Sequence, residues 1–180
     1  GLRTACAVAQ GLAFGAGLPV LPVDSLLAVA EQARFVHAPT LSTCCVTAVL
    51  DARMDEVYAA TYCYAQGRWH NPLPAALLAP QDVARWSDWS AQQHGPWWLA
   101  GNAFAEYGER LGSLDPAAAA ASRVPALPTA AALLRLAPSL LAEGAAVRAE
   151  QALPLYVRDK VAKTTAERAA DKAHASAGQA

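Results

Sequence analysis

The chain has 180 residues, 54% of them hydrophobic, and its 14 Lys and Arg residues nearly balance 15 Asp and Glu residues, for a net charge of −1. The length indicates one domain or two small lobes, and the apolar content suffices for a core, which excludes a chain that is disordered throughout. Proteins that hold nucleic acid by themselves usually carry a basic excess, because phosphate neutralisation supplies most of their affinity, so strong autonomous binding of RNA is not expected.

Targeting signals and cysteine spacing give a first expectation about compartment. No apolar run approaches the roughly 20 residues that a membrane span requires, and no basic-then-apolar signal opens the chain. The four cysteines, Cys6, Cys44, Cys45 and Cys63, show no C-x-x-C spacing. We therefore expect a cytoplasmic protein whose cysteines are buried free thiols, with disulfide or metal ligation as the less favoured alternative.

The first predicted element is a helix over residues 1–16, ending at Gly15 and Gly17. With Val8 and Phe14 on its remaining surface, the helix is apolar nearly all round and must be covered on more than one side. Two interpretations stay open: a core helix between a sheet and a neighbouring helix, or a helix with one face on its own sheet and the other on a partner protein. The apolar stripe at helical spacing consists of Leu2, Ala5, Cys6, Ala9, Leu12 and Ala13.

A short strand over residues 18–23 and a second helix capped by Asp24 or Ser25 follow. The two faces of this helix are Leu26, Leu27, Ala30, Ala33 and Val36 on the apolar side, and Glu31, Gln32 and Arg34 on the polar side.

The clearest hairpin joins residues 45–51 to residues 56–64, both rich in β-branched or aromatic side chains. Its turn carries the carboxylates Asp51, Asp55 and Glu56. A general acid–base pair is conceivable there, but charged residues on a solvated turn are much commoner.

The rest of the chain continues the alternation of strands and helices, which together with the hairpin indicates an α/β domain with a mixed sheet. A polar tail over residues 164–180 is expected to be disordered or a frayed helix. The other predicted elements are a proline-punctuated loop (71–80), a short helix (81–89), a strand (97–100), a helix (103–111), a low-complexity alanine segment (115–122), a helix with Pro128 in its first turn and a kink or break at Pro138, and a short strand (155–157).

Nothing in the sequence assembles a reaction centre. The four histidines are isolated, with no paired-His helix, and neither a G-x-S-x-G elbow nor a phosphate-binding P-loop occurs. We therefore predict no catalytic residues and no metal ligands, and no peptidase chemistry. By itself this favours a binding or interaction module.

Five segments, in order over residues 1–158, carry a family resemblance. They are Gly1-Leu2-Arg3, which is the end of a G-P-G-S-F-T-G-L-R stretch; Asp51, Arg53, Glu56 and Tyr58 in a D-A-R-x-x-E-V-Y pattern; Trp98-Leu99-Ala100-Gly101-Asn102-Ala103; Pro128-Thr129-Ala130 and the leucines after it; and Pro154, Tyr156 and Arg158 in a P-x-Y-[LV]-R pattern. Together they resemble the TsaB (YeaZ-type) family. Because the chain opens at Gly1 and its only methionine is Met54, we expect the family's N-terminal segment to be absent.

The resemblance implies an α/β fold of the actin-like ASKHA (RNase H-like) class, two-lobed and with its first lobe incomplete. Residues 1–40 would be the remainder of the N-terminal lobe, residues 41–163 the C-terminal lobe and residues 164–180 a disordered tail. In such folds Gly101 and Asn102 occupy the place that approaches a nucleotide, although a tight structural turn is the favoured interpretation.

The resemblance also implies a function. TsaB is a non-catalytic partner of the TsaD and TsaE machinery that forms threonylcarbamoyladenosine beside the anticodon of tRNAs reading ANN codons. The first helix would pair with TsaD or with a second TsaB, ATP and metal would belong to the partner subunits, and tRNA would be met only through the complex. The alternatives are a TsaD-like transferase or kinase-like enzyme of the same fold, and a homodimeric scaffold without a tRNA role.

Overall fold

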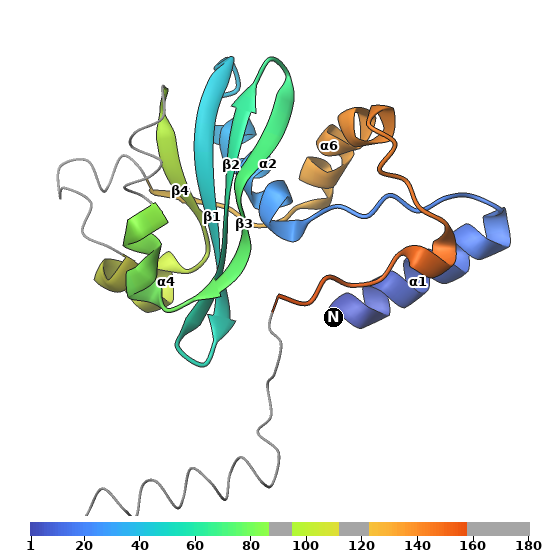
Figure 1. The fold of residues 1–180 in the computed structure, drawn as a ribbon, viewed down its shortest axis with the longest axis horizontal. Helices are drawn as coiled ribbons and strands as arrows, with labels where there is room; N and C mark the ends of the chain where they lie inside the picture. Colours follow the sequence, from blue (N-terminus) through green and yellow to red (C-terminus); the bar gives the residue numbers. More distant parts are fainter. Residues whose placement is uncertain (87–94, 112–122, 158–180) are drawn as a thin grey trace, which may run out of the picture.

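The computed structural model describes residues 1–86, 95–111 and 123–157, and its centre is a five-stranded sheet in the order β3-β2-β1-β4-β5 (Figure 1). The first three strands are antiparallel neighbours, whereas β4 and β5 run parallel to β1. The sheet is therefore mixed, as predicted. The strands are β1 (Thr43–Arg53), β2 (Glu56–Ala65), β3 (Arg68–Leu78), β4 (Trp97–Gly101) and β5 (Arg123–Pro125).

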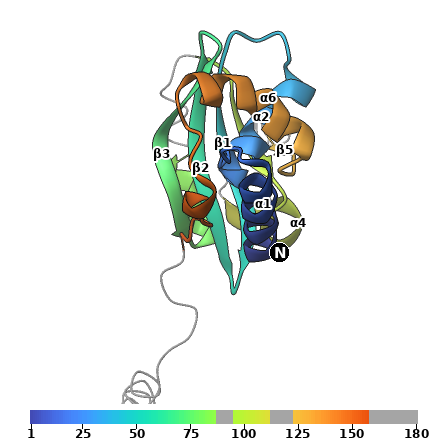
Figure 2. The same ribbon diagram turned by 90° about the vertical axis from the view of Figure 1, so that its right-hand side faces the viewer.

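Helices cover both faces of the sheet. Helix α2 packs on one face and α6 packs on α2, while η1, α4 and η2 lie on the opposite face (Figures 1 and 2). Helix α1 lies apart from the sheet, beside the C-terminal part of the described chain. The helices are α1 (Leu2–Ala16), α2 (Ser25–His37), α4 (Phe104–Tyr107) and α6 (Ala130–Ala142), with 3-10 turns η1 (Pro80–Asp82), η2 (Gly108–Leu111) and η3 (Ala149–Gln151).

Alternation along the strands divides the core into two layers. Val46 and Ala48 of β1 face α2, in a cluster that also contains Trp98, while Val49 and Leu99 face the α4 side. Polar atoms inside the second layer are paired, since the buried hydroxyls of Thr47 and Thr61 lie 2.9 Å apart and the Trp97 indole donates to Thr47 at 3.0 Å.

Helix α2 begins where the sequence predicts. The carboxylate of Asp24 accepts a hydrogen bond from the backbone N–H of Leu26 at 2.8 Å, which satisfies one of the helix's unpaired N-terminal donors. The second oxygen of Asp24 accepts from the hydroxyl of Tyr62 at 2.6 Å, and burial together with that carboxylate raises the pKa of Tyr62. One side chain thus caps α2 and fixes its start over β2.

The predicted hairpin is confirmed: β1 and β2 pair from Thr43 opposite Ala65 to Arg53 opposite Glu56, with a register shift between Asp51 and Arg53. Its turn is unusual because Arg53, Met54 and Asp55 all have positive φ, at 60°, 55° and 62°. A non-glycine residue in the left-handed region costs roughly 1–2 kcal/mol. The contacts of the flanking residues, described below, hold this turn in place.

Residues 68–78 form strand β3, so the predicted loop over residues 71–80 is wrong. Proline is tolerated there because β3 is an edge strand, and its pairing with β2 shifts register near Thr61, opposite Leu73. The predicted strand over residues 18–23 is also wrong: Val20 makes an isolated bridge with Val147, and no continuous ladder forms.

Several predicted boundaries move. Helix α6 starts after Thr129, whose side chain caps it at Ala132, so Pro128 precedes the helix, and Pro138 lies inside it without dividing it. The predicted helix over residues 103–111 breaks into α4 and η2 where Gly108 adopts a φ of 41°.

Residues 155–157 form no strand. The predicted helix over residues 81–89 is helical from 83 to 86, and its end, the alanine segment and the tail over residues 164–180 lie outside the described residues.

The predicted lobe boundary at residue 40 falls between α2 and β1. Val29 and Ala33 of α2 belong to the same buried cluster as β1 and β2. Within the described residues, the structural division falls between the sheet with α2 and α6, which we call the body, and α1 with residues 148–157, which we call the arm. None of the described helices combines the length and the apolar character needed to cross a bilayer.

The expectation of four free thiols is corrected by a disulfide between Cys45 and Cys63, which face each other across β1 and β2. Pairing register, which brings these residues together, cannot be read from cysteine spacing. Cys44 points to the other face and is free, and burial raises the pKa of its thiol to about 11. Cys6 is also free.

Reducing the Cys45–Cys63 bond is expected to lower the free energy of unfolding by no more than about 3 kcal/mol, because it closes a short loop whose ends the hairpin already pairs. Urea unfolding with and without a dithiol reductant measures this, and the Cys45→Ala/Cys63→Ala variant should no longer respond to the reductant. Unfolding of the whole chain on reduction would contradict the expectation.

Candidate partner-binding site

Helix α1 forms as predicted but buries none of its residues. It ends at Gly17, whose left-handed φ of 66° closes the helix, with the Leu18 N–H donating to the Ala13 carbonyl at 2.9 Å. Large apolar side chains on it remain exposed, including Leu12 at 71% and Phe14 at 82%. Because a helix this apolar is stable in water only when covered, its open surface is a candidate contact surface.

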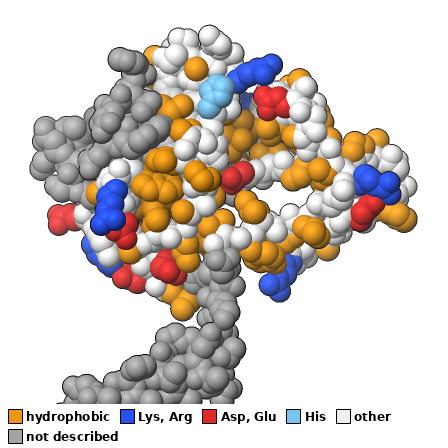
Figure 3. All heavy atoms as spheres, in the orientation of Figure 1, with side chains coloured by type: hydrophobic (Ala, Val, Ile, Leu, Met, Phe, Trp, Pro, Cys, Tyr) orange, Lys and Arg blue, Asp and Glu red, His pale blue; other side chains and the backbone are white. Residues whose placement is uncertain are grey.

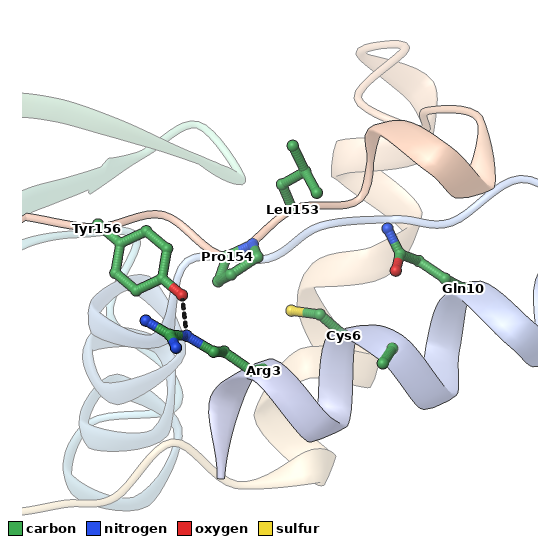
Figure 4. Close-up of a pocket in the computed structure, with 7 residues that line it drawn as sticks. Arg3, Cys6, Gln10, Leu153, Pro154 and Tyr156 are labelled. Carbon is green, nitrogen blue, oxygen red and sulfur yellow. Dashed lines mark hydrogen bonds between the residues drawn. The ribbon is translucent and has the colours of Figure 1, made fainter.

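The residues of the predicted apolar stripe of α1 differ in their exposure. Cys6, Ala9 and Ala13 are half-buried, whereas Leu2, Ala5 and Leu12 are exposed. Cys6 lines the seam between α1 and the rest of the arm (Figure 4). The open part of the stripe is therefore the side that carries Leu2, Ala5 and Leu12.

Residues 148–157 are the tail of the arm. The seam between this tail and α1 contains two open cavities. One of about 420 Å³ is lined by Arg3, Cys6 and Gln10 of α1 and by Leu153, Pro154 and Tyr156 (Figure 4). The other, of about 500 Å³, lies further along, against Phe14 and Arg148. At the first cavity, the Arg3 guanidinium donates through Nε to the hydroxyl of Tyr156 and lies 5.4 Å from the centre of its ring.

The other predicted site residues gather at the ends of β1 and β4. Gly101 passes so close to β1 that a Cβ atom there would lie 1.8 Å from the carbonyl oxygen of Val49. The Asn102 side chain then accepts the backbone N–H of Asp51 at 3.0 Å. Both residues therefore have a structural role, which is to hold the end of β4 against the end of β1.

The carboxylates of the hairpin turn are held by neighbouring elements. Asp51 accepts from the Tyr107 hydroxyl at 2.9 Å and from the Arg53 N–H at 2.7 Å. Burial and this hydrogen bond to Asp51 raise the pKa of Tyr107. Asp55 accepts both arms of the Arg110 guanidinium at 2.6 and 2.7 Å, which lowers its pKa. We call these residues the strand-end cluster; its contacts attach the hairpin turn to α4 and η2.

In the part of the chain that the structure describes, no three His, Cys, Asp or Glu side chains converge as metal ligands would. Here the arrangement offers contact surfaces: the open side of α1, the seam and the strand-end cluster.

Comparison with known proteins shows the family to which the chain belongs. A family model described as TsaD, tRNA N6-adenosine threonylcarbamoyltransferase, matches residues 1–166. Two curated proteins named tRNA threonylcarbamoyladenosine biosynthesis protein TsaB are similar to the chain. The one from Escherichia coli (strain K12) is 35% identical over 163 residues, covering 90% of this chain and 67% of that protein. The chain belongs to the TsaD family, on its TsaB side.

The second TsaB relative, from Haemophilus influenzae, is 31% identical over 170 residues, covering 89% of this chain and 66% of that protein. The chain thus spans about two thirds of the length of these curated relatives. Among solved structures, YeaZ from Pseudomonas aeruginosa is 37% identical with a TM-score of 0.69, covering 87% of this chain and 67% of that one.

A second structure, titled as an uncharacterized protein with similarity to peptidase YEAZ from Pseudomonas aeruginosa, is 36% identical with a TM-score of 0.71, covering 88% of this chain and 68% of that one. These relationships confirm the predicted TsaB (YeaZ-type) resemblance and the actin-like ASKHA class of the fold.

The described residues of the two TsaB-like patterns, Asp51 to Tyr58 and Pro154 to Tyr156, lie at three separate places. Asp51 and Arg53 lie in or beside the strand-end cluster, and the backbone carbonyl of Glu56 accepts from Tyr107 at 3.3 Å. Tyr58 packs on the α2 side of β2. Pro154 and Tyr156 line the seam with α1. Arg158 lies outside the described residues.

Sequence reasoning missed one polar cluster in the body. Glu31, predicted on the polar face of α2, is buried with 3% of its surface accessible. Its carboxylate accepts from Arg34 at 3.0 Å, from Arg135 of α6 at 3.1 Å and from the Trp69 indole of β3 at 3.1 Å. Burial alone would lower the pKa of Arg34, but the hydrogen bond and charge of Glu31 raise it.

This cluster fixes α6 on α2. Gln32 extends it by accepting from Arg135 at 2.7 Å and from Thr129 at 2.8 Å. The available sequence signal was that Arg135 is the one charged residue in α6, an otherwise apolar helix, which points to a partner on a neighbouring element.

Proposed function

We propose that this chain acts as a TsaB-type, non-catalytic partner subunit in the formation of threonylcarbamoyladenosine on tRNA. Support comes from the names of its curated relatives, tRNA threonylcarbamoyladenosine biosynthesis protein TsaB. In this proposal the subunit works in the cytoplasm, contacts tRNA only through the complex, and has a TsaD-type catalytic protein and a TsaE-type ATPase as its partners.

The observation that carries the proposal is the uncovered surface of α1. Leu2, Ala5, Val8 and Leu12 are exposed along its open side, so another apolar helix can pack against them. Its one charged side chain, Arg3, is engaged by Tyr156. An uncharged helical face of this kind fits another apolar helix, as in two-helix packing between a pair of related subunits.

The same proposal assigns ATP and metal to the partner subunits. In support, Asp51 and Asp55, the acidic residues at the strand-end cluster, are engaged by Tyr107 and Arg110 in contacts that attach one element to another. Gly101 and Asn102 have the structural roles described above, which supports a turn in place of a nucleotide contact.

A TsaD-like enzyme is the second candidate, because the matching family model carries that name. Metal analysis of the purified protein distinguishes the two, since a transferase of that kind would retain an ion. A homodimeric scaffold is distinguished by pull-down with a TsaD-type protein, which it would not retain.

Ala5→Arg, on the open side of α1, is expected to weaken association with a TsaD-type partner by at least about tenfold, because the guanidinium would have to be buried without a counter-charge or would hold the helices apart. Titration calorimetry with the full-length protein measures the dissociation constant. Circular dichroism should show an unchanged body, since α1 shares no buried cluster with it.

Ala142→Arg is the matched control, because it places the same side chain on an exposed position of α6. It should bind as the unmodified chain does. If Ala5→Arg bound equally well, α1 would not be the partner surface.

A further inference from the structure

The Cys45–Cys63 disulfide lies on the α4 side of the sheet. The two cysteines are Cα partners across β1 and β2, and their sulfurs are bonded. Val46 and Tyr62, their neighbours along the two strands, belong to the cluster on the α2 side. Because side chains alternate along a strand, the cysteines point the other way. The S–S bond therefore crosses from β1 to β2 on the α4 side.

The pairing register also places one side chain beyond each sulfur. Cys45 is opposite Trp97 of β4, which is partly buried against the cluster on the α4 side. Cys63 is opposite His70 of β3, and His70 is exposed. Trp69, beside His70, packs on the α2 side, so alternation puts His70 on the face of the disulfide. The row across the sheet therefore reads Trp97, Cys45, Cys63, His70.

The two sulfurs of the bond differ in access. Cys45 is 7% exposed, whereas Cys63 is half-buried. In thiol–disulfide exchange the attacking thiolate approaches roughly along the extension of the S–S bond, so access along that line decides which sulfur reacts. The extension past Cys63 leads toward β3 and His70, and the extension past Cys45 leads toward Trp97. A small thiol can therefore reach the sulfur of Cys63 and is kept from that of Cys45.

The outer end of this row belongs to the edge of the sheet. Strand β3 is an edge strand, and it faces the viewer in Figures 1 and 3. Charged side chains of both signs are scattered among hydrophobic ones over the body in that view (Figure 3). A small charged thiol that approaches this edge is therefore not opposed by a surface of one sign.

Opening the bond leaves its frame in place. Strands β1 and β2 pair on both sides of the cysteines, and two positions along the strands the hydroxyls of Thr47 and Thr61 lie 2.9 Å apart. The two thiols of the reduced form thus stay neighbours, and closing the bond again is an intramolecular step. Cys44 does not compete, because it points to the α2 side and burial raises the pKa of its thiol to about 11.

We propose that Cys45 and Cys63 form a thiol–disulfide exchange site for small monothiols, with Cys63 as the sulfur that is attacked. The chemistry is independent of the proposed function, although disulfides in the cytoplasm are generally of this exchanging kind.

The exchange has two steps. A small thiolate bonds to Cys63 Sγ, the S–S bond breaks, and its electron pair goes to Cys45 Sγ, which takes up a proton. A second thiolate then bonds to the sulfur of the first, and Cys63 Sγ leaves with the electron pair and is protonated. Two small thiols are thereby oxidised to one disulfide, and the protein disulfide is reduced to two thiols. The reverse sequence closes the bond again.

Glutathione at several ratios of its reduced and oxidised forms tests whether the bond exchanges in the folded, full-length protein. After an acid quench, free thiols are alkylated and located by mass spectrometry. The bond is expected to open as the reduced fraction rises and to close when the ratio is reversed, with unchanged circular dichroism throughout. If it opened only after urea was added, the bond would be purely structural and the proposal wrong.

Single-cysteine variants in a Cys6→Ser background test which sulfur reacts. With oxidised glutathione, Cys45→Ser should acquire the adduct on Cys63 at least about tenfold faster than Cys63→Ser acquires it on Cys45, because the sulfur of Cys45 is buried. Both variants lack the disulfide, so each is the control for the other. Equal rates, or a faster reaction at Cys45, would overturn the assignment.

The direction of approach is tested by covering it. His70→Trp is expected to slow reduction of the bond by glutathione by about fivefold or more, because an indole would lie across the path to Cys63. Ala142→Trp is the matched control, since it adds the same ring at an exposed position of α6, which packs on α2 on the other side of the sheet, and its rate should match that of the unmodified chain. An unchanged rate in His70→Trp would mean that the thiol does not enter over β3.

Discussion

Glu31→Ala is expected to lower the free energy of unfolding by about 3–5 kcal/mol, one of the two largest effects that the structure predicts for a single substitution. The carboxylate is buried and serves three donors, those of Arg34, Arg135 and Trp69. Their side chains remain in place when it is removed, so two guanidinium groups lose their counter-charge in surroundings where water can only partly replace it. The side chains of Arg34 and Arg135 are 12% and 25% exposed.

Chemical denaturation followed by tryptophan fluorescence measures this loss. Glu31→Gln keeps the shape of the side chain but removes its charge, and should fall between alanine and the unmodified chain. Glu150→Ala is the matched control: its side chain is 58% exposed beside Arg148, so its loss should leave the free energy of unfolding nearly unchanged. A Glu31→Ala variant as stable as the Glu150→Ala control would mean that the cluster contributes no net stability.

The Glu31 cluster also connects the body to the candidate site. It holds α6 on α2, and α6 leads directly into the tail that supports α1. Loosening α6 would therefore displace the start of the tail as well as weaken the core.

Local patterns explain what the sequence could predict. The cap of α2 was predictable, because a short carboxylate such as Asp24 directly before an apolar helix favours capping. Alternation along β1 and β2 likewise predicted the hairpin. Gly17 likewise marks the end of α1. These features depend on neighbours within a few positions along the chain.

Tertiary neighbours decide what the sequence could not show. Pro72 and Pro74 suggested a loop, yet an edge strand has one side without a sheet neighbour and tolerates them. Glu31 was assigned to the polar face of α2, and helical spacing gives no sign of its contact with Arg135, which lies 104 positions away. At the candidate site, the apolar stripe of α1 was predictable, whereas its division by the tail was not.

Gly101→Ala is expected to destabilise the chain by about 3 kcal/mol or more, because two independent constraints act at one position. A methyl group would lie 1.8 Å from the Val49 carbonyl oxygen, which is backbone of the central strand and cannot rotate away. The φ of Gly101 is 150°, a conformation that side chains rarely adopt. Relief would require β4 to separate from β1, which would also break the hydrogen bond from the Asp51 N–H to Asn102.

Gly67→Ala separates these two constraints. Gly67 also has a positive φ, of 80°, but a Cβ there would meet nothing within 4 Å, so its substitution should cost only about 1–2 kcal/mol. The difference between the two variants in urea unfolding measures the steric part of the Gly101 effect. If Gly101→Ala were as stable as Gly67→Ala but changed ATP binding, the glycine would serve a nucleotide. A large loss of stability would instead mean that Gly101 lets β4 pass β1 at close range, which is the role its geometry supports.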